Sequence, residues 1–192
     1  MKHSAPSKVV LIGASTGGPG QIQKIIKSLP ELQDTTIIIA QHMVKGLISS
    51  FMNGLKAYTK NPVLMVEDKL ILSCGSVYFC HGDTKVIQNN YNLIFSHAPA
   101  EENTYNPDIN TLFHSLVPFT GSIQILCIIL TGIGNDGVSG CKELSLKGST
   151  CLTETQLSAI VDGMPYRARQ IVPNIKALDI NEIIQTIKEF CD

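Results

Sequence analysis

Tryptophan is absent from this chain, charged residues are few, and no apolar run is long. Only 16 % of the residues are charged and the net charge is -1, so the excess of basic residues typical of nucleic-acid binding is missing. No apolar run approaches the ~20 residues of a membrane-spanning helix, and the amino-terminal residues lack the apolar core of a signal peptide. The sequence predicts a cytoplasmic protein that neither binds nucleic acid nor spans a membrane.

Cysteine occurs six times, but never in a pattern typical of metal sites or disulfide frameworks. There is no C-x-x-C pair and no cysteine and histidine cluster at zinc-site spacing. Without a secretory signal, reduced thiols that pack as small apolar side chains are expected, as for Cys127 within the apolar run 123–130. The six are Cys74, Cys80, Cys127, Cys141, Cys151 and Cys191.

The 192 residues, of which 44 % are hydrophobic, are enough to bury the core of one domain of ordinary size. The chain shows no internal repeat and no linker that would divide it. We therefore expect a flexible tail over residues 1–8 and a single domain over residues 9–192.

Apolar runs of strand length alternate with amphipathic segments, which is typical of βαβ units. Strands are expected at 9–15, 36–41, 63–66, 77–80 and 123–131, and helices at 19–28, 47–58, from 108, after 137, at 156–161 and at 180–190 with Asn181 as N-cap. Residues 98–107 read as a loop. Short strands at 85–88 and 91–96, joined by Asn89-Asn90, predict an antiparallel hairpin at one edge of the sheet. The pattern predicts an α/β fold with a doubly wound, mostly parallel sheet between helices and ligands at the carboxyl ends of its strands.

The first predicted strand runs into Gly13-Ala14-Ser15-Thr16-Gly17, which matches the G-x-S-x-G pattern of a nucleophile elbow. The match is weak by itself, because short glycine and serine patterns arise by chance. A serine hydroxyl also needs an adjacent base to attack an ester, and the base needs a carboxylate to orient it. The candidate nucleophile is therefore meaningful only together with a base and an acid.

Two other strand ends supply these groups. His42 follows the predicted strand 36–41, and Asp136 stands in Gly132-Ile133-Gly134-Asn135-Asp136-Gly137 after the most apolar strand. Each has a simpler interpretation: a lone histidine beside a strand is often structural, and an aspartate between glycines often caps a helix. Their shared position at strand ends favours a catalytic group with Ser15.

The glycine-rich turn after the first strand also has an alternative interpretation. It could hold a phosphate at a helix N-terminus, which would make the chain a nucleotide-binding module. However, the sequence is neither G-x-G-x-x-G nor G-K-[ST], and the second strand ends in Gln41-His42 where a dinucleotide site places an acidic residue.

Four motifs occur in an order that resembles the protein-glutamate methylesterase of bacterial chemotaxis, the CheB family. They are the segment 13–19, Gln41-His42-Met43, the segment 130–137, and Gly163-Met164-Pro165. The resemblance extends over nearly the whole chain from Val9 onward. It implies hydrolysis of glutamate 5-methyl esters on the cytoplasmic helices of chemoreceptors, with release of methanol and often deamidation of receptor glutamines, and without any metal or organic cofactor.

Carried over by position, the resemblance implies Ser15 as nucleophile, His42 as general base and Asp136 as the carboxylate that orients the imidazole. Thr16 and Ile133 match the positions of the oxyanion site, where their backbone N–H groups would face the developing negative charge. Ile133 replaces the methionine that the family often has. A catalytically inactive, receptor-binding homologue is the remaining alternative.

This chain departs from the family pattern in several places. Only eight residues precede the first predicted strand, so we expect no receiver domain here, and either constitutive activity or control by a separate protein. The segments 78–83, 106–110 and 154–156 also differ from the family pattern and are expected to frame the cleft. Arg167 and Arg169 could meet an acidic receptor surface, although exposed arginines are more often merely solvated.

Overall fold

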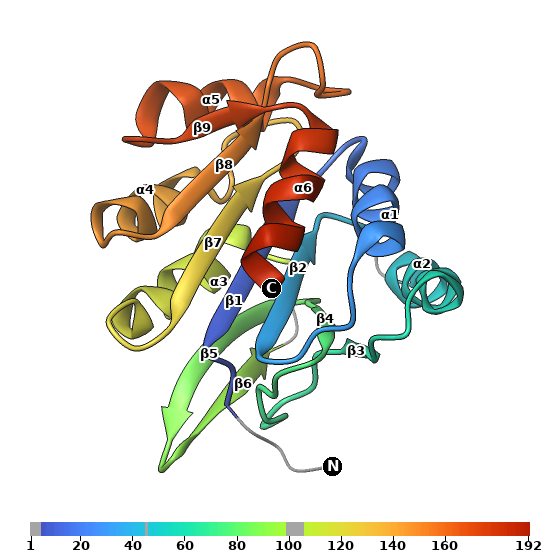
Figure 1. The fold of residues 1–192 in the computed structure, drawn as a ribbon, viewed down its shortest axis with the longest axis vertical. Helices are drawn as coiled ribbons and strands as arrows, with labels where there is room; N and C mark the ends of the chain where they lie inside the picture. Colours follow the sequence, from blue (N-terminus) through green and yellow to red (C-terminus); the bar gives the residue numbers. More distant parts are fainter. Residues whose placement is uncertain (1–4, 45, 99–105) are drawn as a thin grey trace.

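The structure, a computed structural model, describes residues 5–44, 46–98 and 106–192. Within them, a seven-stranded sheet lies between two layers of α-helices (Figure 1). The strands, in spatial order, are β3 (Val63–Met65), β4 (Val77–Phe79), β2 (Thr35–Gln41), β1 (Lys8–Ala14), β7 (Gln124–Ile129), β8 (Thr150–Glu154) and β9 (Lys176–Leu178). Every neighbouring pair is parallel. The predicted α/β class with a doubly wound sheet is confirmed.

Each face of the sheet has its own layer of helices and its own core. One layer consists of α1 (Gly18–Ser28), α2 (Leu47–Leu55) and α6 (Ile180–Cys191), and the other of α3 (Ile109–Leu116), α4 (Val138–Leu146) and α5 (Gly163–Ile171). In Figure 1 the first layer lies in front of the sheet. Because both faces are covered, the central strands contain long apolar runs, and all seven residues of β2 are buried, the polar Thr35, Thr36 and Gln41 included.

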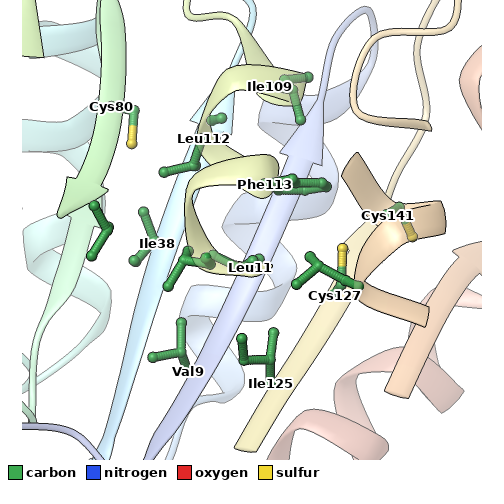
Figure 2. Packing of buried hydrophobic residues seen from close by; sticks show 14 of the residues in the cluster. Val9, Leu11, Ile38, Cys80, Ile109, Leu112, Phe113, Ile125, Cys127 and Cys141 are labelled. Carbon is green, nitrogen blue, oxygen red and sulfur yellow. The ribbon is translucent and has the colours of Figure 1, made fainter. Parts of the chain in front are cut away.

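The side chains of β1 alternate between the two cores. Val9 and Leu11 pack with Ile38 and with Phe113 of α3, as Figure 2 shows, whereas Ile12 packs with the first layer. All of these side chains are fully buried. The alternation is the two-residue period of a strand, here with apolar residues on both faces.

The predicted hairpin exists but does not form an edge of the main sheet. β5 (Asp83–Asn89) and β6 (Asn92–Ala98) pair antiparallel as a separate two-stranded sheet, and the edges of the main sheet are β3 and β9. The hairpin packs through Val86 and Phe95 into the same core as α3, and Ser115 Oγ of α3 accepts a hydrogen bond from the Val86 amide at 2.9 Å. The hairpin therefore packs against α3, whereas we expected it to pair with an edge strand of the main sheet.

The last quarter of the chain differs most from the prediction. The helix expected at 156–161 is wrong, since turns follow β8 there, and α5 begins only at Gly163. Pro165 lies within the first turn of α5, where a missing N–H costs no hydrogen bond. The short strands β8 and β9 were not predicted, because their mixed polar sequences lack a clear period.

Three boundaries also shift. The N-cap of α6 is Asp179 instead of Asn181, and Asp179 and Glu182 form a capping box. β1 begins at Lys8, inside the predicted tail, whereas residues 1–4 lie outside the described residues. The predicted loop 98–107 also falls mostly outside them, and Ala98 ends β6.

The order of the strands indicates where in the fold a ligand would bind. From β1 the chain goes to β2 on one side, and the later strand β7 pairs with β1 on the other side. This is a topological switch point, and such sheets bind ligands at the carboxyl ends of the strands that flank it. No helix among the described residues combines the length and the apolar character that crossing a bilayer requires.

Candidate active site

Ser15 and His42 lie at the carboxyl ends of two neighbouring strands. Ala14 and Gln41, the last residues of β1 and β2, are partners in the parallel register, and the His42 amide donates to the Ala14 carbonyl at 2.9 Å. The residue that follows each strand is thus placed beside the other. The structure brings the predicted nucleophile and the predicted base to the same edge of the sheet.

The Gln41 side chain connects these two strand ends through hydrogen bonds. Its side chain is buried, and its Nε2 donates to the Ser15 carbonyl at 2.9 Å and to the His42 carbonyl at 2.7 Å. One amide group therefore holds the backbone of both candidates. The sequence showed Gln41 only as part of a family motif, since nothing local tells which carbonyls a buried amide will bind.

Asp136 reaches His42 from the loop that follows β7. Its Oδ2 lies 2.7 Å from His42 Nε2, and the two side chains are only 4 % and 11 % exposed. A carboxylate in this position fixes the orientation of the imidazole and stabilises its protonated form. The pairing joins residues that are 94 positions apart in the sequence.

Backbone amides hold the Asp136 carboxylate in place. Ile109 and Asn110 donate to it at 2.9 Å each, and Gly137 donates at 2.8 Å. Burial alone would raise the pKa of Asp136, but the hydrogen bonds from His42 and from the Ile109 and Asn110 amides outweigh this effect and lower the pKa. Asp136 is therefore a carboxylate at neutral pH. The alternative interpretation, that Asp136 only caps a helix, does not account for these contacts with α3.

The loops around Ser15 carry the backbone amides of Thr16 and Ile133, each of which follows an amide that is already hydrogen-bonded within the protein. The Ser15 amide donates to Thr131 O at 3.0 Å and the Gly132 amide donates to Val161 O at 2.9 Å, so these two are engaged within the protein. The next residues along each loop are Thr16 and Ile133, the positions predicted for the oxyanion site. Thr16 is exposed and the Ile133 side chain is 64 % exposed, so both lie where a substrate can reach them.

Gly132 lies against the candidate nucleophile. A methyl group at this position would lie 2.6 Å from Ser15 Cβ and 2.4 Å from the sulfur of the fully buried Met164. Only glycine fits between them. Met164 of the Gly163-Met164-Pro165 motif thus forms the floor beneath this loop.

Glu154 was not predicted as a site residue. It ends β8 with its side chain fully buried, and its carboxylate accepts hydrogen bonds from the Thr131 amide and from Gln21 Nε2, both at 2.7 Å, and from Ser158 Oγ at 3.0 Å. It thereby fixes Thr131, whose carbonyl binds the Ser15 amide. No local signal identified it, because the mixed polar sequence of β8 does not reveal that its last residue is buried.

Arg169 is a structural residue. Its guanidinium binds both carboxylate oxygens of Asp162 at 2.8 and 2.6 Å and the Glu154 carbonyl at 2.6 Å. These contacts fit neither of the two interpretations that the sequence left open for Arg169, contact with an acidic partner surface or simple solvation. Arg167 lies over the ring of Tyr166, with 6.0 Å between its guanidinium carbon and the ring centre.

A cavity of about 410 Å³ lies next to the strand end that carries His42. Met43, His81 and His97 are among its lining residues, whereas Ser15 and Asp136 are not. The two histidine rings are 4.1 Å apart, with His81 just before β5 and His97 within β6. Burial and the neighbouring His81 lower the pKa of His97.

Sequence comparisons place the whole domain in one group of relatives. Residues 10–187 match the model of the family described as CheB methylesterase. The chain is 32 % identical over 182 residues to the protein-glutamate methylesterase/protein-glutamine glutaminase of Escherichia coli O157:H7, and 27 % identical over 184 residues to enzyme 3 of that name from Vibrio cholerae. These alignments cover 93 % and 91 % of this chain but 51 % of each relative, so the chain spans about half their length.

The fold agrees with this result. The crystal structure of the Thermotoga maritima CheB methylesterase catalytic domain superposes with a TM-score of 0.87 at 25 % identity, and the match covers 96 % of this chain and 99 % of that one. Sequence and fold therefore agree with the four motifs. The chain belongs to the CheB methylesterase family.

Proposed function

We propose that this chain is a serine hydrolase that removes methyl groups from glutamate 5-methyl esters of chemoreceptors in the cytoplasm and releases methanol. The relatives from E. coli and V. cholerae carry this activity in their names, together with glutaminase activity. The observation that carries the proposal is the buried pair of His42 and Asp136, 2.7 Å apart, beside Ser15 at the switch point of the sheet.

Ser15 begins the reaction as the nucleophile. Its oxygen attacks the ester carbonyl while His42 takes the hydroxyl proton, and the Asp136 carboxylate stabilises the imidazolium that forms. Because Nε2 of His42 binds Asp136, Nδ1 is the nitrogen that accepts and returns the proton. Methanol leaves with that proton, and the substrate remains as an ester of Ser15.

The Thr16 and Ile133 amides stabilise the negative charge on the carbonyl oxygen during attack. Two features support this: the amides next to them are already engaged, and α1 begins at Gly18, so its positive end faces the same place. Water then attacks the Ser15 ester with His42 again as the base. Attack on a receptor glutamine would release ammonia by the same steps.

A protein substrate is supported by the surface around the strand ends. Val44 and Leu47 after β2, Ile133 after β7, and Leu157 and Ile160 after β8 are all more than half exposed. Large apolar side chains on several loops of one site are typical of a surface that binds another protein. We therefore propose that a receptor helix lies across these loops.

The nucleotide-binding alternative finds less support. A phosphate at the start of α1 would be bound by free backbone N–H groups. The Gly18 amide there already donates to the Ser15 carbonyl at 2.8 Å.

Methanol release from methylated receptor membranes tests the proposal. We expect release by the wild type, and a rate lower by on the order of 10⁴-fold or more in Ser15→Ala. The matched control is Ser122→Ala, since Ser122 is exposed before β7, at the opposite end of the sheet. A serine-reactive phosphonate should label the wild type and Ser122→Ala at Ser15.

Two results would contradict the proposal in different ways. Phosphonate labelling without methanol release, where an active relative demethylates the same membranes, would mean that the hydrolase acts on another ester. Neither labelling nor release would favour the inactive, receptor-binding homologue.

A further inference from the structure

Three of the six cysteines meet in space although the sequence separates them. Cys127 of β7, Cys141 of α4 and Cys151 of β8 have their sulfur atoms within 4.8 Å of one another. Figure 2 shows Cys127 and Cys141 next to each other between the strand and the helix. Parallel pairing places Cys127 opposite Cys151, and α4 brings Cys141 over both.

Cys151 is the member of this cluster that solvent can approach. It lines a surface cavity of about 250 Å³ together with Ser145 and Lys176, although its own side chain is only 3 % exposed. Cys127 and Cys141 are fully buried. A small neutral oxidant that enters this cavity therefore meets Cys151 first.

The environment of Cys151 favours its thiolate. Hydrogen bonds from the thiols of Cys127 and Cys141, and one from Ser145, hold the pKa of Cys151 well below the usual thiol range. Burial raises the pKa of Cys127 well above it. The cluster thus places two further thiols within 4.8 Å of the Cys151 sulfur.

We propose that this cluster is a redox modification site, in which a hydroperoxide oxidises Cys151 and Cys141 then forms a disulfide with it. The Cys151 sulfur attacks one oxygen of hydrogen peroxide, an S–O bond forms, the O–O bond breaks, and the departing hydroxide becomes water. The Cys141 sulfur then attacks the sulfenic acid, the S–S bond forms, and the hydroxyl group leaves with the Cys141 proton as water. Two thiols lose two electrons and two protons, and one peroxide becomes two waters.

Cys141 is the resolving partner because it can move. Cys127 and Cys151 lie opposite each other within the hydrogen-bonded ladder of β7 and β8, so joining them would distort the sheet. Cys141 lies on a helix that packs on the sheet through side chains, and Cys151 Sγ lies 3.6 Å from its carbonyl oxygen. A shift of α4 toward β8 closes the bond.

The disulfide would also reach the candidate active site. α4 begins at Val138, directly after Asp136 and Gly137, and Cys141 lies in its first turn. A shift of this helix moves the loop that presents the carboxylate to His42. Oxidation is therefore expected to slow the reaction of Ser15.

Peptide mapping by mass spectrometry tests the proposal. The reduced chain is treated with hydrogen peroxide, quenched with catalase, unfolded and alkylated. We expect a disulfide between the peptides of Cys141 and Cys151, formed at least about tenfold faster than any oxidation of Cys80 or Cys191. These two are matched controls, because they are buried thiols whose pKa is raised by burial, to about 12 and about 11.

Two variants separate the steps. In Cys141→Ala the Cys151 sulfenic acid should persist and be trapped by dimedone. In Cys151→Ala neither Cys127 nor Cys141 should be oxidised. Oxidation of Cys151 no faster than that of Cys191, or a disulfide to Cys127 in the wild type, would overturn the proposal.

The mass readout does not depend on the proposed esterase. Phosphonate labelling of Ser15 should slow on oxidation and recover with dithiothreitol. An absence of labelling in the reduced protein would count against the proposed function, whereas unchanged labelling despite a full disulfide would overturn the link through α4.

Discussion

The candidate site depends on single atoms that hold the reacting groups in place. Gln41 Nε2 binds the carbonyls of both Ser15 and His42, and three backbone amides bind Asp136. These contacts fix orientation rather than supply chemistry. Substitutions that displace a group without removing it should therefore also slow the reaction, although less than those that remove the group.

Gly132 provides the clearest case. In Gly132→Ala the new methyl group would lie 2.6 Å from Ser15 Cβ, so the serine must shift. We expect methanol release to fall on the order of 100-fold, since a displacement of about 1 Å has such an effect on aligned groups. Gly20→Ala in α1 is the control, because nothing lies within 4 Å of a methyl group there. Equal activity of the two variants would mean that Ser15 is not the reacting group.

The carboxylate of Asp136 makes the stability of the folded protein depend on pH. Its pKa is lowered in the folded protein, so its carboxylate stabilises the fold fully above the unfolded pKa of about 3.9 and loses this effect as the pH falls through the folded pKa. In Asp136→Asn we expect a loss of about 1–3 kcal/mol at pH 6 that shrinks below about pH 4, and activity lower by about 10⁴-fold.

Urea unfolding at several pH values and phosphonate labelling measure these effects. Asp179→Asn is the control, because asparagine caps a helix about as well as aspartate and Asp179 lies at the N-terminus of α6. A stability difference that stays constant from pH 3 to pH 7 would show that the charge of Asp136 is not what matters.

At the scale of elements, each strand of the switch region supplies one group through the loop that follows it. β1 carries Ser15, β2 carries His42, and the loop after β7 carries Asp136. β8 contributes Glu154, which anchors that loop from below. The same loops expose the apolar side chains proposed to contact the receptor.

Val44 and Leu157 test this surface without touching the reacting groups. They are 72 % and 99 % exposed, on the loops after β2 and β8. In Val44→Ser with Leu157→Ser we expect KM for methylated receptors to rise about tenfold, from a loss of ~1.4 kcal/mol of binding, while hydrolysis of p-nitrophenyl acetate is unchanged. Leu146→Ser is the control, since Leu146 is 66 % exposed at the end of α4 away from these loops. A parallel loss on both substrates would instead indicate damage to the site.

At the scale of the whole molecule, two cores on either side of one sheet hold the site rigid. Leu11 and Ile12 are neighbours on β1, both fully buried, and they belong to opposite cores. Neither face of the sheet is open to solvent at these positions. The strand ends that carry the site are therefore fixed from both sides.

Alanine substitution at each residue measures the two cores separately. We expect Leu11→Ala and Ile12→Ala each to lower the free energy of unfolding by about 2–5 kcal/mol, because a buried cavity is left on either face. Leu64→Ala on edge strand β3, where the side chain is 37 % exposed, should have a much smaller effect. Urea unfolding with unchanged m-values is the measurement. A loss of less than about 1 kcal/mol at either buried position would mean that its face is poorly packed.

The sequence alone predicted much of the fold, because strands that are buried on both faces need apolar runs that can be recognised in the sequence. β1, β2 and β7 each contain an apolar run, and the polar residues that follow these runs mark the site. The resemblance to the family adds roles for Ser15, His42 and Asp136. The structure brings these three to one edge of the sheet, and their catalytic roles remain proposals.

Only the tertiary structure decided what depends on contacts between distant residues. Local periodicity does not tell that the hairpin packs on α3 instead of extending the sheet, or that Gly163 and Pro165 begin a helix. Nor does spacing along the chain reveal that Glu154 holds Thr131, or that Cys127, Cys141 and Cys151 meet. The sequence by itself determined which faces are apolar and where strands end in polar groups. Tertiary packing determined which of these groups meet, because strand register and helix placement result from contacts across the whole chain.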